Sequence, residues 1–184
     1  MSTRIKIKDK EFETFLSSKK LTDRIRELGD EITDDLLGKD PLFIVVLNGA
    51  LFFGAELFLN IDIPTAEITT TRLKSYAGTQ STGKIKTIMP LQEDIGGRTV
   101  VIVEDIVDSG TTIQRIVQQV KDLGAAEVYT AILLFKKEAC KVKDLHLDYV
   151  GFEVPDKFVV GHGFDYDEQG RNLRDVYALV EGSR

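Results

Sequence analysis

The sequence predicts an α/β fold in which helices flank a mainly parallel central sheet, with a small irregular subdomain near the C-terminus. Three segments, 42–47, 99–103 and 128–135, are almost entirely apolar, as strands buried on both faces of a parallel sheet are. Helical patterns alternate with these strands, which is typical of right-handed crossovers between parallel strands. Beyond residue 145 the pattern changes to short strands separated by turns.

The first predicted helix is marked by apolar residues that recur at spacings of three and four, which places them on one face. These residues are Leu21, Ile25, Leu28, Ile32 and Leu36. Thr22 or Ser18 would cap the start of this helix, and Gly38 followed by Pro41 would end it.

The remaining elements are predicted from apolar patterning and from turn residues. We expect helices over 50–59 and 112–123, and strands over 66–73, 85–89, 149–154, 158–160 and 176–180. Residues 75–84 contain two glycines and almost no apolar side chain, so we expect an exposed and mobile loop. The whole chain, 1–184, is expected to form a single domain. Its core would span about 38–145, and a smaller hood would be formed mainly by 146–184 with a contribution from the N-terminus.

The composition is that of a globular protein with an acidic balance. Of 184 residues, 42% are hydrophobic and 29% are charged, which excludes intrinsic disorder. The 30 acidic and 24 basic residues give a net charge of −6, which disfavours bulk nucleic-acid binding but leaves a local basic patch open. Cys140 is the only cysteine, which excludes an intramolecular disulfide and a cysteine-rich zinc site.

The sequence predicts a cytoplasmic protein. The first ten residues have no apolar segment, so we expect no secretory signal. The mostly apolar stretch 42–59 is interrupted by Asn48, Gly54 and Glu56, which the centre of a bilayer would penalise. A buried strand, a tight turn and a core helix explain this stretch better than a membrane span.

The segment 100–112 carries the residues best suited to chemistry. Its apolar strand runs into Glu104 and Asp105, and a third carboxylate, Asp108, follows three residues later. Ligands of open parallel sheets bind at the carboxyl ends of strands, where these acids are expected to lie. Carboxylates accept hydrogen bonds from hydroxyl groups, so Glu104 and Asp105 suit the hydroxyls of a sugar.

A turn rich in hydroxyl groups follows these acids. Ser109, Gly110, Thr111 and Thr112 offer successive backbone N–H groups at the start of a helix, which suits a phosphate monoester. Together the acids and the turn predict a site for a sugar phosphate. In the alternative, the acids only solvate a strand end and the turn only caps a helix, which accounts less well for the third acid.

Other ligand motifs fit the sequence poorly. Gly49 and Gly54 are five residues apart, but the lysine and hydroxyl residue of a P-loop do not follow Gly54. No Gly-x-Gly-x-x-Gly follows a strand, which disfavours a dinucleotide-binding fold. His146 and His162 are too far apart to form a zinc pair on one helix.

The segment 101–112 resembles the phosphoribosyl-pyrophosphate motif of the type I phosphoribosyltransferases. Three further segments narrow the resemblance to the hypoxanthine-guanine branch of that family, and Arg171-Asn172-Leu173 completes the pattern. These segments are Leu47-Asn48-Gly49, Arg72-Leu73-Lys74-Ser75-Tyr76 and 150–166. The resemblance extends from about Leu42 to Val180 and implies the type I phosphoribosyltransferase fold and a Mg²⁺-dependent enzyme of purine salvage.

The resemblance implies transfer of the 5-phosphoribosyl group from phosphoribosyl pyrophosphate to N9 of hypoxanthine or guanine, which yields IMP or GMP. Residues 109–112 would hold the 5′-phosphate, and Glu104 and Asp105 would hold the ribose hydroxyls. Asp108 would act as general acid and base at N7 of the purine. Ser75-Tyr76 would lie on a loop that closes over the reacting centre and excludes water from an oxocarbenium-like transition state.

The resemblance also implies the ligands of pyrophosphate and metal. The turn Leu47-Asn48-Gly49 would offer backbone N–H groups to pyrophosphate, and Arg171 would add positive charge there. Asp165 would bind Mg²⁺, directly or through water, and Glu104 and Asp105 are further candidates as metal ligands. Magnesium prefers oxygen ligands and keeps several waters, which suits so sparse a set.

The purine base would be recognised by a third group of residues. Lys157 would donate to O6, Phe158 would stack on the ring, and the backbone around Val159 and Phe164-Asp165 would meet the remaining edge. A lysine is only a donor, so it pairs with the 6-oxo group but leaves the 6-amino group of adenine badly matched.

Several of these residues also fit a structural role. Lys157 follows a proline and an aspartate and fits a solvated turn, Phe158 fits a core position, and Asp165 and Arg171 fit a surface ion pair. The segment Lys136-Lys137-Glu138 is expected to be a solvated strand end, with a backbone contact to the ligand left open.

Two positions depart from the family pattern. Asn48 stands where relatives often carry a basic residue, so pyrophosphate would depend more on the backbone and on Arg171. His162 stands at a position that is often aromatic, and it would touch the base edge or only pack nearby. The preference between hypoxanthine and guanine is therefore left open.

Two other functions compete with this one. A regulator that binds phosphoribosyl pyrophosphate or nucleotides as effectors would need a DNA-binding extension or a basic face, and we expect neither. A transferase for xanthine or a pyrimidine would differ only in the base pocket, where Lys157-Phe158 favours 6-oxopurines. The enzyme is favoured because Ser75-Tyr76, Asp108 and Lys157 occur together. We expect a homodimer or homotetramer that binds neither nucleic acid nor membrane.

Overall fold

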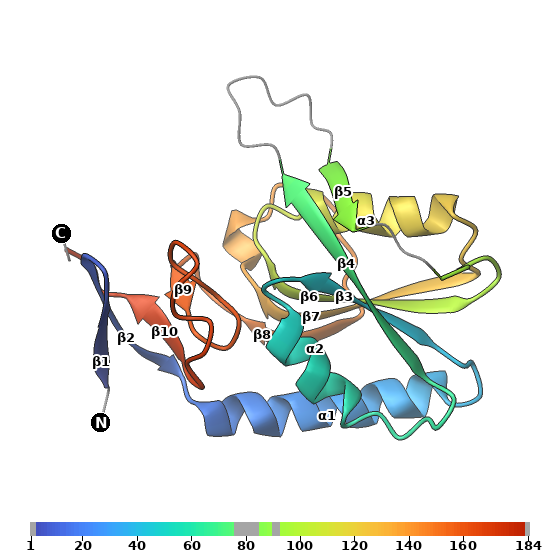
Figure 1. The fold of residues 1–184 in the computed structure, drawn as a ribbon, viewed down its shortest axis with the longest axis horizontal. Coiled ribbons are helices and arrows are strands. Elements are labelled where there is room, and N and C mark those ends of the chain that lie inside the picture. The colour runs from blue at the N-terminus through green and yellow to red at the C-terminus, as the bar shows by residue number, and fades with distance from the viewer. Residues whose placement is uncertain (1–2, 76–84, 90–92, 183–184) are drawn as a thin grey trace.

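The computed structural model describes residues 3–75, 85–89 and 93–182, and within them it contains a large sheet and a small one (Figure 1). The large sheet has five parallel strands and one antiparallel strand at an edge. In hydrogen-bonded order its strands are β5 (Ile85–Met89), β4 (Glu67–Ser75), β3 (Leu42–Leu47), β6 (Thr99–Val107), β7 (Glu127–Phe135) and β8 (Tyr149–Glu153). The predicted α/β fold with a mainly parallel central sheet is confirmed.

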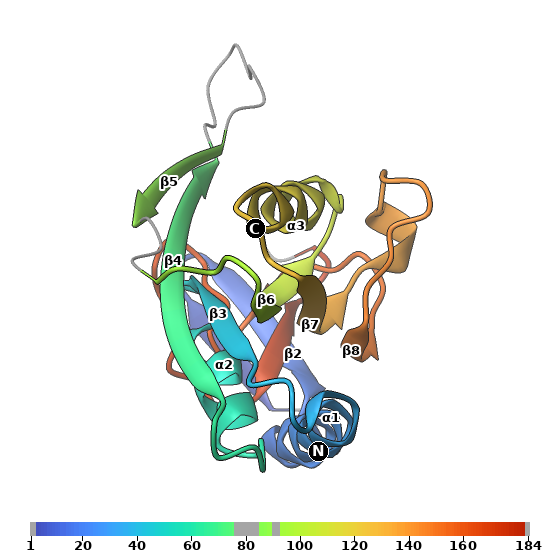
Figure 2. The same ribbon diagram turned by 90° about the vertical axis from the view of Figure 1, so that its right-hand side faces the viewer.

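Helices cover both faces of the large sheet, as Figure 2 shows. The helices α1 (Ser18–Leu36) and α2 (Leu51–Phe58) pack on one face, and α3 (Thr111–Asp122) packs on the other. The buried odd-numbered residues of β3 belong to the core under α1 and α2, and its even-numbered residues belong to the core under α3. Because both faces are covered, the central strands are apolar at almost every position.

The helix α1 buries the predicted apolar stripe but begins earlier than the sequence indicated. Its cap is Ser17, whose hydroxyl accepts a hydrogen bond from the Lys20 N–H at 3.4 Å. Ser18 and Thr22, the predicted caps, lie inside the helix. The Ser18 N–H donates instead to the Asp175 carboxylate at 2.6 Å, so a residue from the far end of the chain completes the helix start.

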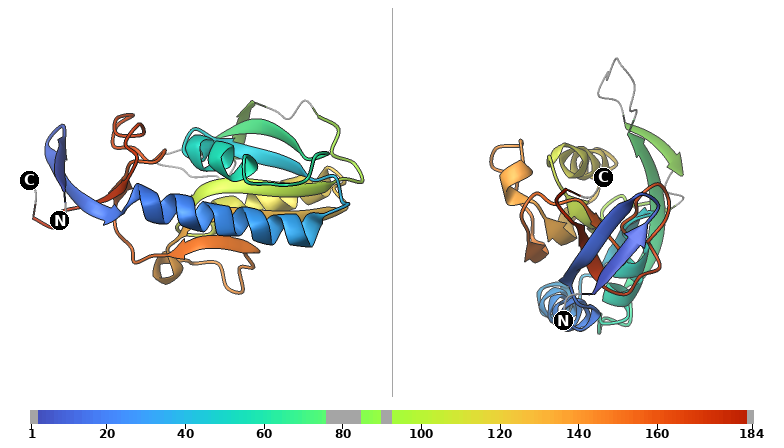
Figure 3. Two further views of the ribbon diagram at one scale, coloured as in Figure 1. Left: turned by 90° about the horizontal axis from the view of Figure 1, so that it is seen from below. Right: turned by 90° about the vertical axis from the view of Figure 1, so that its left-hand side faces the viewer.

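The small antiparallel sheet forms the hood. In order, its strands are β1 (Arg4–Ile7), β2 (Lys10–Leu16), β10 (Val176–Leu179) and β9 (Val159–Val160). The sequence analysis placed no strands before α1, because β2 is mostly charged and polar and only Phe12 within it is fully buried. Pairing of β2 with β10 joins the two ends of the chain in this sheet (Figure 3).

The boundary between core and hood differs from the expected one. Strand β8 pairs in parallel with β7 and so extends the large sheet past residue 145. A single 3₁₀ turn, η1 (Lys137–Ala139), follows β7. The apolar stretch 42–59 forms β3, a turn and α2, and among the described residues no helix is both long and apolar enough to cross a bilayer.

Candidate active site

The candidate active site lies at the carboxyl ends of β3 and β6, which are parallel neighbours in the middle of the large sheet. From this pair, β4 lies on one side and β7 on the other, so the strand order changes direction here. Ligands of open parallel sheets bind at such a switch point. Three predicted groups come together at this place: the acid pair, the hydroxyl-rich turn and the turn after β3.

Glu104 and Asp105 lie within β6, because that strand stays paired with β7 as far as Val107. The prediction that this strand ends at Val103 is therefore wrong. Glu104 Oε2 is buried and has no hydrogen-bond partner among the described residues, while Asp105 Oδ1 accepts the Ile106 N–H at 2.8 Å. The strand thus carries two adjacent carboxylates into the protein interior.

Burial makes both carboxylates harder to ionise than exposed ones. It raises the pKa of Glu104 well above its ordinary value, and the neighbouring charge of Asp105 raises it further. Burial also raises the pKa of Asp105 to about 6, although hydrogen bonds and the positive charge of Arg171 oppose this increase. Hydroxyl donors or a cation placed against the pair would favour its ionised form.

The turn after β3 packs directly on Asp105. A Cβ built on Gly49 would overlap the Asp105 carboxylate, so only glycine leaves room for the acid. The Leu47–Asn48 peptide bond in this turn is cis. Asn48 also borders a hollow of about 620 Å³ that residues 168–172 line from the other side. The turn thus contacts Asp105 through Gly49 and borders this hollow through Asn48.

The hydroxyl-rich turn forms a small pocket at the start of α3. Gly110 adopts a left-handed conformation, with φ of 79°, and α3 begins at the next residue. The Ser109 hydroxyl lies 3.4 Å from both the backbone N and the hydroxyl of Thr111. Together with Glu104 and Asp108, the turn lines a cavity of about 120 Å³. A compact anion in this cavity would meet a helix N-terminus beside the acid pair.

Lys136 is a candidate that the sequence analysis missed. Its side chain is only 9% exposed, and its Nζ lies 2.8 Å from Asp156 Oδ1 and 3.4 Å from Asp108 Oδ2. The prediction of a solvated strand end is wrong for Lys136, although Lys137 and Glu138 are exposed. A buried ammonium therefore lies beside the predicted acid-base residue.

The register of the sheet explains why this lysine meets Asp108. Val107 and Phe135 are paired in parallel strands, so the next residues, Asp108 and Lys136, leave the sheet side by side. Each residue directly follows the last residue of its strand, and that shared position was the only signal in the sequence. Its meaning depends on which strands are neighbours.

Lys157 lies in a different environment. The residue is exposed, and its Nζ lies 6.0 Å from the centre of the Phe15 ring. Phe158 is 46% exposed, with its ring edge-on to Tyr166 at 6.0 Å and tilted against Phe12 at 6.3 Å. The structure thus excludes the core position for Phe158 and leaves half of its ring open.

Two other hood residues predicted to bind the base, Val159 and Phe164, have buried side chains. Val159 lies in β9 and is 8% exposed, and Phe164 is 5% exposed and packs in the core under α1 and α2. Only the backbone of these residues is therefore suited to meet a ligand.

Arg171 and Asp165 form an ion pair. Arg171 Nη2 lies 2.7 Å from Asp165 Oδ1 and 3.2 Å from Glu168, and its Nη1 donates to the Gly163 carbonyl at 2.7 Å. The second Asp165 oxygen accepts the Glu168 N–H at 2.8 Å. The side chains of Arg171 and Asp165 are 24% and 28% exposed, so the predicted surface pair is in fact half-buried.

Of the two predicted residues Ser75 and Tyr76, only Ser75 lies within the described residues. Ser75 is the last residue of β4, whereas Tyr76 and the rest of the loop 76–84 lie outside the described residues. Among the residues that are described, no group of three or more histidine, cysteine, aspartate or glutamate side chains forms a metal site by itself.

The sequence matches known proteins over most of its length. The family model of the phosphoribosyl transferase domain matches residues 12–169. A hypoxanthine-guanine phosphoribosyltransferase of Streptococcus thermophilus is 40% identical over 166 residues, which cover 90% of this chain and 91% of that protein. One of Bacillus subtilis is 40% identical over 165 residues, which cover 89% of this chain and 91% of that protein.

Solved structures agree with these matches. A hypoxanthine phosphoribosyltransferase of Staphylococcus aureus has a TM-score of 0.86 and 34% identity, with 91% of each chain covered. The Trypanosoma cruzi enzyme in complex with its product IMP has a TM-score of 0.86 and 29% identity, with 96% of this chain and 98% of that chain covered. The chain therefore belongs to the phosphoribosyltransferase family, and within it to the hypoxanthine-guanine phosphoribosyltransferases, which are transferases of purine salvage.

Proposed function

We propose that this chain transfers the 5-phosphoribosyl group of phosphoribosyl pyrophosphate to N9 of hypoxanthine or guanine and releases pyrophosphate. The observation that carries the proposal is the pairing of Asp108 with the buried Lys136, beside an acid pair and a helix N-terminus. A 6-oxopurine needs two neighbouring groups: an acid that transfers a proton at N7 and a cation that donates a hydrogen bond to O6.

The ribose and its phosphate would be held by the segment 104–112. The turn 109–112 offers backbone N–H groups and hydroxyls to the 5′-phosphate. Glu104 also lines the cavity of about 120 Å³ at this turn. The ribose hydroxyls would donate to Glu104 and Asp105. Glu104 Oε2, which has no partner among the described residues, would then gain one.

The base would be oriented by Asp108 and Lys136. On a purine, N7 and the substituent at C6 lie on the same edge, so a residue that faces N7 has the O6 ligand as its neighbour. Lys136 lies in that neighbouring place, whereas Lys157 is exposed and lies near Phe15. We therefore propose that Lys136, and not Lys157, donates a hydrogen bond to O6 of the base. The half-exposed ring of Phe158 would stack on the base.

The chemical step requires charge control and the exclusion of water. As the bond from C1′ to pyrophosphate breaks, positive charge develops on the ribose ring, and the ionised pair Glu104 and Asp105 stabilises it. Asp108 accepts the proton that the purine loses as N9 forms its new bond and returns it in the reverse reaction. Ser75-Tyr76 would belong to the loop that shields this centre.

A divalent metal is typical of this enzyme class, and we propose Mg²⁺. The donor set fits this ion, because Glu104 and Asp105 supply carboxylate oxygens and Glu104 Oε2 has no partner among the described residues. Both oxygens of Asp165 already bind Arg171 or the Glu168 N–H, so Asp165 would reach the metal through water or after Arg171 moves. When bound, Mg²⁺ would neutralise charge on the departing pyrophosphate.

The proposed partners are small molecules and a further copy of the chain. They comprise hypoxanthine, guanine, phosphoribosyl pyrophosphate, IMP and GMP, in a cytoplasmic homodimer or homotetramer. The turn Leu47-Asn48-Gly49 and Arg171 would hold pyrophosphate from opposite sides of the hollow that they border.

The proposed reaction is tested by nucleotide formation from phosphoribosyl pyrophosphate and Mg²⁺ with hypoxanthine, guanine, xanthine and adenine in parallel. We expect turnover of the 6-oxopurines and not of adenine. The substitution Asp108→Asn removes the proton acceptor and should lower kcat by about 100-fold or more. Binding of nucleotide without turnover of any base would refute the enzyme and favour a regulator.

The assignment of O6 is tested by Lys136→Met and Lys157→Met. Loss of the Lys136 ammonium should lower kcat/KM for hypoxanthine by about 100-fold, because a donor to the carbonyl is lost. The same change at Lys157 should lower it by less than about threefold, since removal of an exposed charge costs little.

Both variants should fold, because Asp108 and Asp156 are each more than half exposed and remain solvated without Lys136. Circular dichroism and thermal unfolding check this point. The reverse ranking, with Lys157→Met the more damaging change, would return the O6 contact to Lys157.

The buried acid pair predicts that removing one of its charges raises the stability of the fold and lowers the activity. A carboxylate whose pKa is raised by folding destabilises the fold when it is ionised, so stability decreases as pH rises through the folded pKa. Glu104→Gln should therefore raise the Tm by about 2–4 °C near neutral pH and change it little at about pH 4, while kcat/KM falls.

Glu153→Gln serves as the matched control. Glu153 ends β8, and its side chain is 59% exposed, so the same change should leave the Tm unaltered at both pH values. A lower Tm for Glu104→Gln near neutral pH would show that the ionised acid stabilises the fold. That result would contradict the strain that we assign to the pair.

A further inference from the structure

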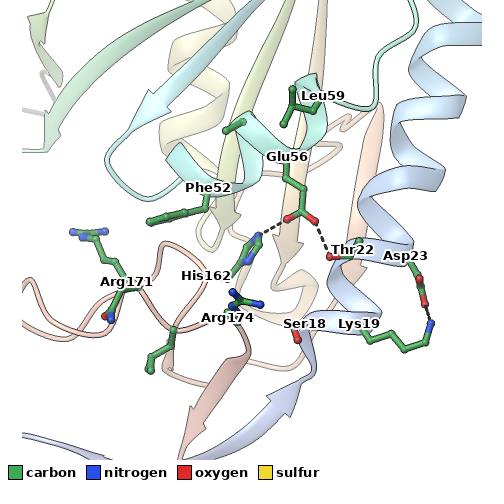
Figure 4. A pocket seen from close by; sticks show the side chains of 13 residues that line it. Ser18, Lys19, Thr22, Asp23, Phe52, Glu56, Leu59, His162, Arg171 and Arg174 are labelled. Atoms are coloured by element: carbon green, nitrogen blue, oxygen red, sulfur yellow. Dashed lines mark hydrogen bonds and ion pairs between the residues drawn. The ribbon is translucent and has the colours of Figure 1, made fainter.

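His162 lies on the hood loop 161–164 and points toward helix α2 (Figure 4). Its side chain is only 10% exposed, and its backbone has a φ of 50°, between two glycines with φ of 94° and 103°. Side chains with a Cβ rarely adopt this left-handed conformation. The loop therefore accepts strain at a position where the imidazole is directed into the protein.

The imidazole faces a polar contact that joins both helices of one sheet face. His162 Nε2 lies 3.7 Å from Glu56 Oε2, and Glu56 Oε1 accepts the Thr22 hydroxyl at 2.7 Å (Figure 4). Thr22 belongs to α1 and Glu56 to α2. These three residues line a cavity of about 720 Å³ between the helices and the hood. His162 is thus the hood residue that faces Glu56 and Thr22 of the core.

This link lies next to the pyrophosphate side of the active site. The residue after His162, Gly163, packs on the carbonyl of Gly49 so closely that a Cβ on it would overlap that oxygen. The Gly163 carbonyl in turn accepts a hydrogen bond from Arg171 Nη1 at 2.7 Å. A shift of His162 toward or away from Glu56 would therefore move the loop that contacts the Gly49 turn and Arg171.

We propose that His162 is a positioning residue whose pairing with Glu56 holds the hood loop 161–164 against the turn 47–49 when substrate is bound. This inference rests on the proposed roles of Arg171 and Asp165, which the same hood supplies. The pairing acts through those residues, since His162 points into the neighbouring cavity.

The link should respond to protonation. His162 Nε2 has no hydrogen-bond partner among the described residues, and the backbone of Arg174 raises the pKa of the ring. A neutral imidazole that donates from Nδ1 leaves Nε2 as an acceptor that faces a carboxylate. Only the protonated ring donates from both nitrogens, and it would form a charge-assisted hydrogen bond to Glu56 once the gap of 3.7 Å closes.

The charges around His162 decide which form the free protein adopts. Burial lowers the pKa of His162 and is the largest effect, whereas the charge of Glu56 and the backbone of Arg174 raise it. The charged groups that line the same cavity are Lys19 and Asp23 of α1, Glu56 of α2, and Arg171 and Arg174 of the hood. Lys19 and Asp23 pair with each other at 2.6 Å, so Glu56 is the acid that faces the ring. The free enzyme near neutral pH therefore holds a neutral His162.

Linkage then predicts proton uptake on binding. If the bound state draws His162 to Glu56, a ligand that stabilises this state must raise the pKa of the imidazole. The chain has only two histidines, His146 and His162, so each can be followed in a ¹H–¹⁵N spectrum of the side-chain nitrogens. His146→Gln assigns the two signals.

The first experiment titrates both histidines with and without saturating IMP. We expect the pKa of His162 to rise on binding, and the exposed His146, which pairs with Asp148, serves as the internal reference. Binding of IMP with an unchanged His162 titration would overturn the inference and leave the proposed function intact. Failure of IMP to bind would overturn the proposed function and the inference with it.

The second experiment measures KM for phosphoribosyl pyrophosphate in His162→Phe, Glu56→Gln and the double variant. Phenylalanine keeps the ring without its nitrogens, and glutamine keeps an acceptor for Thr22. Each single change should raise KM by about five- to tenfold with kcat within about twofold, and the double variant should add little, because both remove one interaction.

The pH profile separates positioning from a purely structural role. Asp105 also titrates near pH 6, so the informative quantity is the ratio of KM between His162→Phe and the wild type. This ratio should increase as the pH falls from about 8 to about 5.5, as His162 gains its proton. His146→Phe should give a ratio near one throughout. A pH-independent ratio, or additive effects in the double variant, would refute the pairing.

Discussion

Two carboxylates at the end of the central strand set the main constraint on this site. Glu104 and Asp105 are drawn into the protein because β6 stays paired with β7 for two residues beyond them, although its pairing with β3 ends at Val103. Gly49 is needed because Asp105 occupies the space of a side chain. A buried acid pair is unfavourable when it is ionised, so binding of hydroxyls or a cation is coupled to its charge.

The hood shows how distant parts of the chain combine at one side of this site. Strand β2 from the N-terminus pairs with β10 from the C-terminus, and Asp175 just before β10 binds the first N–H of α1. The loop 161–164 then contacts the Gly49 turn through Gly163. The hood therefore contacts the core through the Asp175 carboxylate and through the backbone of Gly163.

Local patterns in the sequence were sufficient for the core and for the two C-terminal strands of the hood, but not for its two N-terminal strands or for Lys136. The runs 42–47 and 128–135 are apolar because helices cover both faces of their sheet, and this cause is visible in one segment at a time. Strand β2 has no such signature, since its stability comes from pairing with a strand at the other end of the chain. Lys136 looked solvated because nothing in its own segment reveals that Asp108 is its neighbour.

The positions of these groups imply how the purine lies. N9 must face the ribose acids, and the edge with N7 and O6 would face Asp108 and Lys136, which both follow strands of the large sheet. The remaining edge, which carries C2, then faces the backbone of the hood. Hypoxanthine and guanine share O6 and differ only at C2. In the proposed arrangement, discrimination against adenine would depend on Asp108 and Lys136 at the sheet edge. Any preference between hypoxanthine and guanine would depend on the hood, whose loop carries His162 at 3.7 Å from Glu56.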